Sequence, residues 1–442
     1  MSITSIGPNY PTDHANGLEL LKRLQVPALF ARDVEECSST EYDEFFANVA
    51  TTFKELLELI KREPANTLSE HFLDQVIFTC SRYLGEMPWS TQSIRNSVTA
   101  IFYQLGQNLD LSVTAMIDSR LEDILEQQFK PLFKRDPRLE RDFQKHRGRK
   151  TATQDFYENQ AWKSNFIGAV TGFRWCLQTA TSTALSHCQD LIIPPLLTLI
   201  DDFDIRYKVI GVELLDLLLD CVDTLKLRKL GLDRVFYEAL TSCLTYRSNA
   251  VEADLLSAAL DTILHLVNQV YPQDSKEWWL KIEDIFLNGI IDGFSLGGDN
   301  IAIRSVIIQK APLFLDTMGT FSVQYLAPLV KELTKTLKLP ILDDPQGKDI
   351  HFKTAQSIEI LIKIAWPRIH DYCHDLLTAL LVVWVNVHRN GGMDNLSQLL
   401  LHIYTLLYTI CGDQFQHELD TLRKLNDPIF EPLLNPTLAE SR

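Results

Sequence analysis

The sequence predicts an all-α protein, an α-solenoid whose helices follow one another in pairs. Gly and Pro number only 18 each among 442 residues, so residues that break helices are scarce. Apolar residues recur three and four positions apart in many stretches, as in Leu396, Leu399, Leu400 and Ile403. No stretch alternates apolar and polar residues between hairpin turns. We therefore expect almost no β-strand.

The chain before residue 130 is predicted to form an N-terminal helical region, 1–129. The clearest start is Thr67-Leu-Ser-Glu70, a capping box in which the Thr oxygen accepts from free amides and the Glu reaches back. Gly85 and Pro88 mark the end of that helix. The expected helices cover 16–31, 40–62, 67–84, 92–108 and 110–129.

A basic segment, 130–156, is predicted to be an exposed loop and the main boundary of the chain. Residues 130–150 hold nine Lys or Arg and three acids, and Pro131, Pro137 and Gly148 interrupt any helix there. Three uses stay open: a nuclear localisation signal, an electrostatic dock for an acidic partner, or a solvated loop.

Helix pairs are predicted over 157–425, followed by a loosely held, Pro-containing tail, 426–442. Successive pairs are spaced by roughly 35–45 residues, as in helical-repeat proteins. The pairs are 192–201 with 205–220, 233–246 with 250–269, 275–292 with 300–317, 321–338 with 351–366, and 367–389 with 394–411.

A short motif recurs where the second helix of a pair begins. Asp201 to Arg206 and Asp299 to Arg304 both read D-x-x-x-I-R. This resembles the signature of HEAT repeats, where an Asp in the turn and an Arg in the next helix bridge neighbouring repeats. The fold class is thus an α-solenoid of HEAT-like helix pairs. We expect Asp201, Arg206, Asp299 and Arg304 to be structural residues between repeats.

Composition argues against several classes of protein. The net charge of −16 opposes direct binding to nucleic acid, which requires a positive field. The eight cysteines include no C-x-x-C pair and are interpreted as small buried residues in a reducing compartment. The start of the chain does not resemble a secretory signal, and the apolar run Leu376–Val387 is too short to span a bilayer. We expect a cytoplasmic and nuclear protein.

The one candidate for metal chemistry is His370-Asp-Tyr-Cys-His374, because two His four residues apart can share a helix face. No convincing third ligand follows, so a structural or exposed pair is the favoured interpretation. A di-iron site is opposed because His417-Glu418 is the sole His-Glu dipeptide. Motifs for a nucleophilic Ser, a P-loop or a dinucleotide are absent. We therefore expect no catalytic, cofactor-binding or metal-binding residues, and no enzyme activity.

An aromatic helix start follows the basic segment, with Trp162-Lys163 and then Phe173-Arg-Trp-Cys176. Large aromatic side chains most often pack in a core, and this interpretation is favoured. They also dominate the energetics of protein interfaces. As candidates for partner binding we name Trp162, Lys163, Tyr207 and Lys208.

The stretch from Trp162 to Leu219 resembles the Tti-two family, the second Tel-two-interacting proteins, and is closest to fungal members. The resemblance rests on WKSNF at 162–166, FRWCL at 173–177 and IIPPLLTLIDDFDIRYKVIGVELLDLLL at 192–219, with PWSTQ at 88–92 in agreement. The rest of the chain agrees with that family only in its length and in its predicted helical content.

The resemblance implies a non-catalytic subunit of the Triple-T complex, beside Tti-one-like and Tel-two-like proteins. That complex acts with a heat-shock chaperone and a RuvB-like ATPase co-chaperone to mature phosphatidylinositol-kinase-related kinases of the ATM, ATR and TOR types. The family has no catalytic residues to transfer to this sequence. Three alternatives stay open: a HEAT-type nuclear transport adaptor, a metal hydrolase using His370 and His374, and a binder of DNA lesions, which the charge opposes.

Overall fold

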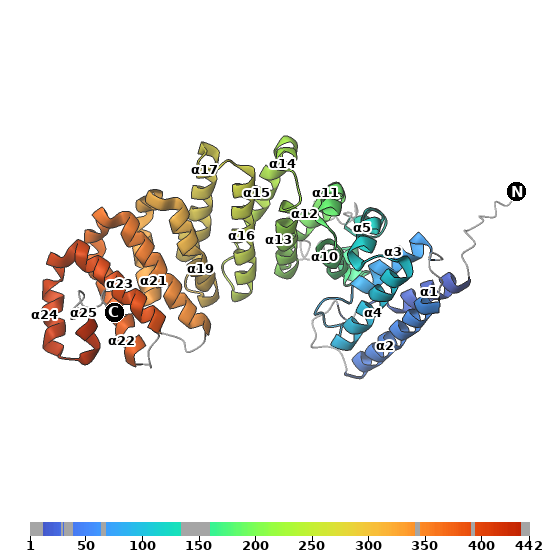
Figure 1. Cartoon of the computed structure of the whole chain (residues 1–442), viewed down its shortest axis with the longest axis horizontal. Coiled ribbons are helices and arrows are strands. Elements are labelled where there is room, and N and C mark those ends of the chain that lie inside the picture. The colour runs from blue at the N-terminus through green and yellow to red at the C-terminus, as the bar shows by residue number, and fades with distance from the viewer. Residues whose placement is uncertain are drawn as a thin grey trace, which may run out of the picture. The chain divides into compact units, whose positions relative to one another are not determined.

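The computed structural model describes residues 12–27, 30, 39–62, 68–133, 160–340, 345–389 and 394–434. Within these ranges every regular element is a helix and none is a strand. The chain divides into two compact units, Met1–Val235 and Phe236–Arg442, and each unit is a stack of helices (Figure 1). The all-α prediction is therefore confirmed.

The division at residue 235 differs from the predicted boundary in the basic segment. The helices on either side of that segment belong to one unit because their side chains pack together. The rings of Phe129 and Phe173 lie 5.4 Å apart between centroids, and those of Phe133 and Trp162 lie 5.5 Å apart. The carboxylate of Asp118 also accepts from the backbone and hydroxyl of Thr181.

The helices of the N-terminal unit follow the predicted ones except for the first, which was expected over 16–31 and is Thr12–Arg23. α2 packs between α1 and α4, and α3 contacts α1, α5 and α10. The helix expected over 67–84 begins at Glu70, three residues later, because Ser69 is the N-cap and its Oγ accepts from Phe72 N. Thr67 lies outside the described residues. The elements are α1 (Thr12–Arg23), α2 (Ser39–Arg62), α3 (Glu70–Ser81), α4 (Gln92–Leu109) and α5 (Val113–Ile124).

The prediction that 130–133 belongs to an exposed loop is wrong. A π-helical turn, Leu125–Phe129, carries α5 on into α6 (Lys130–Phe133), where Leu132 and Phe133 are buried. Burying these apolar side chains away from water stabilises the helix more than the neighbouring basic residues disfavour it. Residues 134–156 lie outside the described residues.

The unit continues with shorter helices that lead to a long pair. α12 and α13 pack closely along their length, and α10 contacts α13. Asp204 caps α13 by accepting from Arg206 N at 2.9 Å. The elements are α9 (Ala161–Ser164), α10 (Ala169–Thr179), α11 (Ser182–His187), α12 (Gln189–Ile200), α13 (Ile205–Leu219), α14 (Thr224–Leu230) and α15 (Leu232–Cys243), the last of which spans the division.

The C-terminal unit has the two-layered arrangement of a solenoid. The second helices of the pairs, α16, α19, α21 and α23, pack side by side in one layer, and α20 and α22 contact each other in the other. Three of the predicted pairs are confirmed here, since α18 packs on α19, α20 on α21 and α22 on α23. The elements are α16 (Ala253–Val270), α17 (Lys276–Ile285), a π-helical turn (Phe286–Ile291), α18 (Asp292–Gly297), α19 (Ile301–Met318), α20 (Leu326–Leu337), α21 (Pro345–Ala365), α22 (Cys373–Arg389) and α23 (Asp394–Cys411).

The start of the predicted loose tail is packed, so that prediction is wrong for residues 428–434. After α24 (Gln416–Leu425), a 3₁₀ turn (Pro428–Phe430) leads into α25 (Glu431–Leu434). The indole of Trp384 donates to Ile429 O at 2.8 Å, and Phe430 and Leu433 are buried. Among the described helices, none is long and apolar enough to cross a membrane.

Gly211 sets how closely α13 approaches α12. A Cβ there would lie 2.8 Å from both the backbone N and Cγ1 of Ile200. We predict that Gly211→Ala lowers the free energy of unfolding by about 1–3 kcal/mol, because the two helices must move apart. Urea unfolding followed by circular dichroism measures this. Gly412→Ala is the matched control, since its Cβ would meet nothing closer than 3.8 Å. Equal stability of both variants would contradict the prediction.

Candidate functional site

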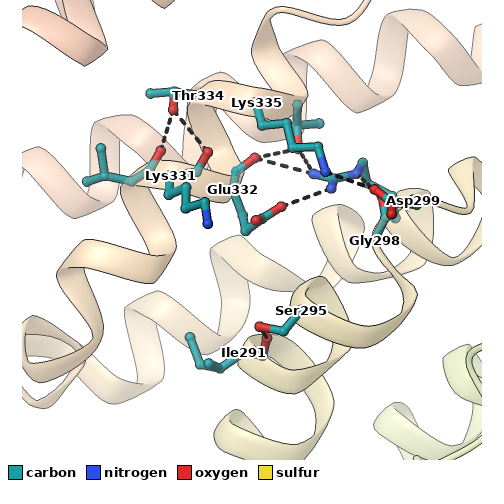
Figure 2. Close-up of polar contacts among 11 residues, drawn as sticks. Ile291, Ser295, Gly298, Asp299, Lys331, Glu332, Thr334 and Lys335 are labelled. Carbon is teal, nitrogen blue, oxygen red and sulfur yellow. Dashed lines mark hydrogen bonds and ion pairs between the residues drawn. The ribbon is translucent and has the colours of Figure 1, made fainter.

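Arg304 is the centre of a buried polar cluster, and its partners Gly298 and Glu332 are labelled in Figure 2. Its side chain is 2% exposed, and its guanidinium joins three helices. Nε donates to the carbonyl of Gly298 after α18, while Nη1 donates to Thr336 Oγ1 and Nη2 pairs with Glu332 Oε2 at 2.9 Å, both in α20. The predicted role of Arg304 between repeats therefore agrees with its geometry.

The turn that carries the cluster is shaped to admit the guanidinium. A Cβ at Gly298 would lie 2.8 Å from Arg304 Nη2 and closer still to Phe294 O, so the site requires glycine. The guanidinium carbon also lies 5.6 Å from the centroid of the Phe294 ring. A bulkier side chain at position 298 would displace the cation from its acceptors.

Asp299 pairs with a different cation from the expected one. Its carboxylate is 2.9 Å from Lys335 Nζ, which lies one turn from Glu332 on α20 (Figure 2). The hydrogen bond from Lys335 lowers the pKa of Asp299. Because the Asp299 side chain is 97% exposed, solvent screens this pair and its contribution to stability is small.

The two D-x-x-x-I-R motifs are not equivalent in the structure. The N-cap of α13 is Asp204, whereas the N-cap of α19 is Asn300. Arg206 is therefore two residues past its cap and 84% exposed, and it pairs with Asp204 at 2.6 Å. This contact lies within its own helix start, in contrast to the expected bridge between repeats. Asp201 is the C-cap of α12.

The counterpart of Arg304 in the first motif is Lys208, four residues past the cap. Lys208 is 5% exposed, and its Nζ donates to Ile200 O, at the end of α12, at 2.6 Å. The last carbonyls of a helix have no partner within the helix, so a buried cation satisfies one of them. Lys208 was named above as a candidate for partner binding, but its side chain is committed to this turn.

A third helix pair has the same arrangement with a histidine. His351, in α21, is 2% exposed, and its Nε2 is 3.1 Å from Leu339 O, just past the end of α20. Its Nδ1 is 3.0 Å from Gly347 O. Lys208, Arg304 and His351 are here called the turn-locking residues, because each ties the start of a second helix to the end of the first.

The other candidates for partner binding form an interior cluster. Trp162 is 1% exposed, stacks on Phe133, and meets the ring of Tyr207 edge-on at 4.7 Å. Lys163 Nζ is 2.7 Å from Asp202 Oδ1 and lies over both the Trp162 and Tyr207 rings. The residues do come together, but their contacts join α6, α9 and α13. This favours the core interpretation over a surface for a partner.

Burial controls the protonation of this interior cluster. It raises the pKa of Asp202, and the hydrogen bond and charge of Lys163 oppose the rise. Asp202 Oδ1 also accepts from Asp204 N at 2.8 Å, whereas Oδ2 has no hydrogen-bond partner. Burial likewise raises the pKa of Tyr207 to about 12. Lys163 is thus the group whose charge and hydrogen bond offset the cost of burying the Asp202 carboxylate.

His370 and His374 belong to different helical elements and contact different partners. His370 belongs to a 3₁₀ helix, Trp366–Tyr372, and its Nδ1 is 3.8 Å from Cys411 Sγ. His374 belongs to α22, and its Nδ1 is 3.4 Å from Glu418 Oε1. Within the described ranges, no group of three or more His, Cys, Asp or Glu is arranged to hold a metal ion.

A cavity of about 640 Å³ lies beside His370, between the C-terminal end of α23 and the turn that follows. Tyr408, Cys411 and Asp413 are among its lining residues. Desolvation raises the pKa of Cys411, and that of the neighbouring Cys373 rises to about 12. Both thiols are therefore protonated at neutral pH, the opposite of what a cysteine nucleophile requires.

Both units also carry exposed apolar side chains that were not predicted from the sequence. In the N-terminal unit, Leu225 is 74% exposed and Leu230 57% exposed, both on α14. In the C-terminal unit, Phe321 and Trp366 stand at the connections that precede α20 and α22, with 55% and 60% of their surface exposed. In the sequence, the run of Leu and basic residues TLKLRKL at 224–230 could have indicated the exposed side chains of α14.

These features define a HEAT-like helical-repeat protein whose buried polar clusters join helices. A sequence model of the Tti2 family matches residues 73–343, more than half of the chain, and the chain therefore belongs to the Tti2 family. That range contains both D-x-x-x-I-R motifs and the interior cluster around Trp162.

Two mammalian proteins illustrate the relationship. TELO2-interacting protein 2 of Homo sapiens is 25% identical over 241 residues, which cover 54% of this chain and 46% of that protein. The protein of the same name from Mus musculus is 24% identical over 232 residues, covering 52% and 44%. The chain thus spans about half the length of the curated relatives it matches.

Solved helical-repeat structures resemble the chain more distantly. A chain in a structure of Kap95p with RanGDP has a TM-score of 0.45 at 11% identity, covering 97% of this chain and 48% of its own. Importin beta has a TM-score of 0.42 at 12% identity, covering 96% and 51%. No functional inference follows from these similarities.

The two motif arginines should differ sharply in their effect on stability. We predict that Arg304→Ala lowers the free energy of unfolding by about 3–5 kcal/mol, since it leaves Glu332 and the Gly298 carbonyl without their buried partner. Arg206→Ala should change it by less than about 0.5 kcal/mol, because that side chain is solvated. Thermal melting of both variants checks this, and similar midpoints would contradict it.

Removing Lys163 should make stability depend on pH. Since burial already holds the folded pKa of Asp202 above its ordinary value of 3.8, loss of Lys163 raises that pKa further. Stability is then retained where Asp202 is protonated and is lost as the pH rises through the raised pKa. We expect Lys163→Met to cost about 2–4 kcal/mol at pH 7 and markedly less near pH 4.5.

Urea titrations at the two pH values measure the difference between wild type and variant. Lys163→Arg, which keeps the charge, is the control and should follow the wild type. A deficit of Lys163→Met that is independent of pH would show that lost packing, and not the charge on Asp202, is responsible.

Proposed function

We propose that this chain is a non-catalytic scaffold subunit of a Triple-T complex. It binds a Tti-one-like solenoid and stands beside a Tel-two-like protein. Through them it supports the maturation and stability of phosphatidylinositol-kinase-related kinases of the ATM, ATR and TOR types. The observation that carries the proposal is the match of residues 73–343 to the Tti2 family. The name of the mammalian relatives describes them as TELO2-interacting, which agrees with this role.

The chemistry of the described residues supports binding over catalysis. The conspicuous charged side chains, Arg304, Lys208 and Lys163, each bind a helix end or a buried carboxylate. Apolar side chains, in contrast, are exposed at the edges of both units. Large exposed apolar and aromatic residues are typical of surfaces that another protein covers.

A repeat scaffold contributes to its partners by holding a surface in a fixed shape. Each helix pair buries its apolar face on its neighbours, so the turns and edges stay free to contact another chain. We propose a cytoplasmic and nuclear location, with a heat-shock chaperone and a RuvB-like ATPase as indirect partners. The alternative of a nuclear transport adaptor is based on the HEAT-like fold alone.

Depletion of the chain in its own cells tests the proposal. We predict that loss of the chain lowers the protein levels of ATM-, ATR- and TOR-type kinases several-fold, without a change in their transcripts. Quantitative mass spectrometry and transcript counting measure the two effects. Unchanged kinase levels would contradict the proposed role.

Re-expression of variants supplies the internal control for that experiment. Arg206→Ala should restore the kinases fully, because its side chain is exposed and its loss leaves the fold intact. Arg304→Ala should restore them poorly, in proportion to the amount of folded protein that accumulates. Equal restoration by both would argue that the repeat fold around α19 is not needed.

A further inference from the structure

α14 presents an apolar and basic face to solvent. This seven-residue helix is held by one fully buried side chain, Leu227, which is 1% exposed. At about 100° per residue, Leu225, Lys229, Lys226 and Leu230 follow one another along one arc of the helix, with Leu225 and Lys229 opposite Leu227 and Leu230 on its flank. All four side chains are exposed. The face is therefore directed away from the unit that carries it.

The ends of α14 are capped, so the face is held in one conformation. Asp223 at the N-cap accepts from Leu225 N at 2.9 Å. Gly231 at the C-terminal end has a φ of 71°, and its N–H donates to Arg228 O at 3.1 Å. Such a left-handed residue ends a helix sharply and directs the chain into α15 (Figure 1). A rigid surface loses less entropy when a partner binds than a mobile one does.

The first turn of α15 follows α14 directly after Gly231. There Val235 is 42% exposed and Arg234 is also exposed, while the sole acid of the stretch, Asp233, is buried. Residues 224–235 thus contain four basic residues and one acid, within a chain whose net charge is −16. We define Leu225, Lys226, Lys229, Leu230, Arg234 and Val235 as the α14 patch.

We propose that the α14 patch binds an acidic amphipathic helix of the Tti-one-like subunit. The exposed aliphatic side chains require an apolar stripe, and the surrounding cations require carboxylates beside that stripe. The patch is basic although the whole chain carries a net charge of −16, so carboxylates beside the apolar stripe are attracted to it. A helix is the favoured occupant because its residues three and four apart present one apolar stripe between two charged margins. This inference rests on the proposed function.

Binding of purified proteins tests the proposal directly. The whole chain is immobilised and titrated with the purified Tti-one-like subunit of the same organism, at low and at moderate salt. We expect Leu225→Ser/Leu230→Ser and Lys226→Glu/Lys229→Glu each to weaken binding by about tenfold or more, because the first removes the apolar part of the contact and the second reverses its charge. Raising the ionic strength should weaken the wild type and have less effect on the charge-reversed variant.

Two controls make the result specific to the patch. Lys424→Glu/Leu425→Ser changes the same two residue types on α24, where Leu425 is 60% exposed and Lys424 is exposed, and should alter affinity less than twofold. Lys226→Arg/Lys229→Arg keeps the charge and should bind like the wild type. Melting curves verify that each variant is folded, which is expected since all the changed side chains are exposed.

Each outcome decides the matter. A loss of affinity in the two patch variants, with both controls unaffected, supports the proposal. If the patch variants bind the subunit as tightly as the wild type does, the patch is not the binding surface, and the proposed function is unaffected. Failure of the wild type to bind the subunit overturns the proposed function and the patch with it. If the patch variants retain the subunit but lose binding to anionic phospholipid vesicles, the patch is a lipid-binding surface and the proposal is overturned.

Discussion

A helix pair in this protein cannot bury its apolar surface within itself, and the rest of the structure depends on that constraint. In the C-terminal unit α19 packs against both α16 and α21, and α21 packs in turn against α23. The side chains at these contacts, such as Ile307 and Ile358, are almost fully buried. Burying an aliphatic side chain of this size stabilises the folded state by about 1.5–3 kcal/mol. Stability is therefore shared between neighbours, as in other repeat proteins.

The same constraint creates a second problem at the turns. When two helices of a pair are packed between neighbours, the last carbonyls of the first helix are removed from water and lack partners in the helix. The turn-locking residues solve this problem with three different side chains, a Lys, an Arg and a His. Arg304 extends the solution to the next pair through Glu332 and Thr336. The burial of these three side chains is therefore explained by the backbone carbonyls that they contact.

Several predictions from the sequence could succeed because they depend on local chemistry. Helix positions and pairing follow from the spacing of apolar residues and from cap residues such as Ser69 and Asp204. The role of Arg304 followed from its motif, but the matching role at the first motif was assigned to Arg206 in place of Lys208. The predicted start at residue 205 agrees with α13, but both Asp201 and Asp204 are suitable cap residues, so the letters alone do not reveal which of them is the cap. The partner residues were likewise chosen by type, and burial then placed Trp162 and Lys208 inside.

The sequence by itself determined the helical class, the pairing of the helices and the membership suggested by WKSNF and the stretch that follows, because each rests on residues near one another in the chain. The tertiary structure alone decided which charges are buried, that Asp202 meets Lys163, and that Leu225 and Leu230 remain outside. It also joined the helices on either side of the basic segment into one unit through Phe129 and Phe173. These outcomes depend on contacts between distant residues, and solvent exposure is a property of the packed chain and not of any single side chain.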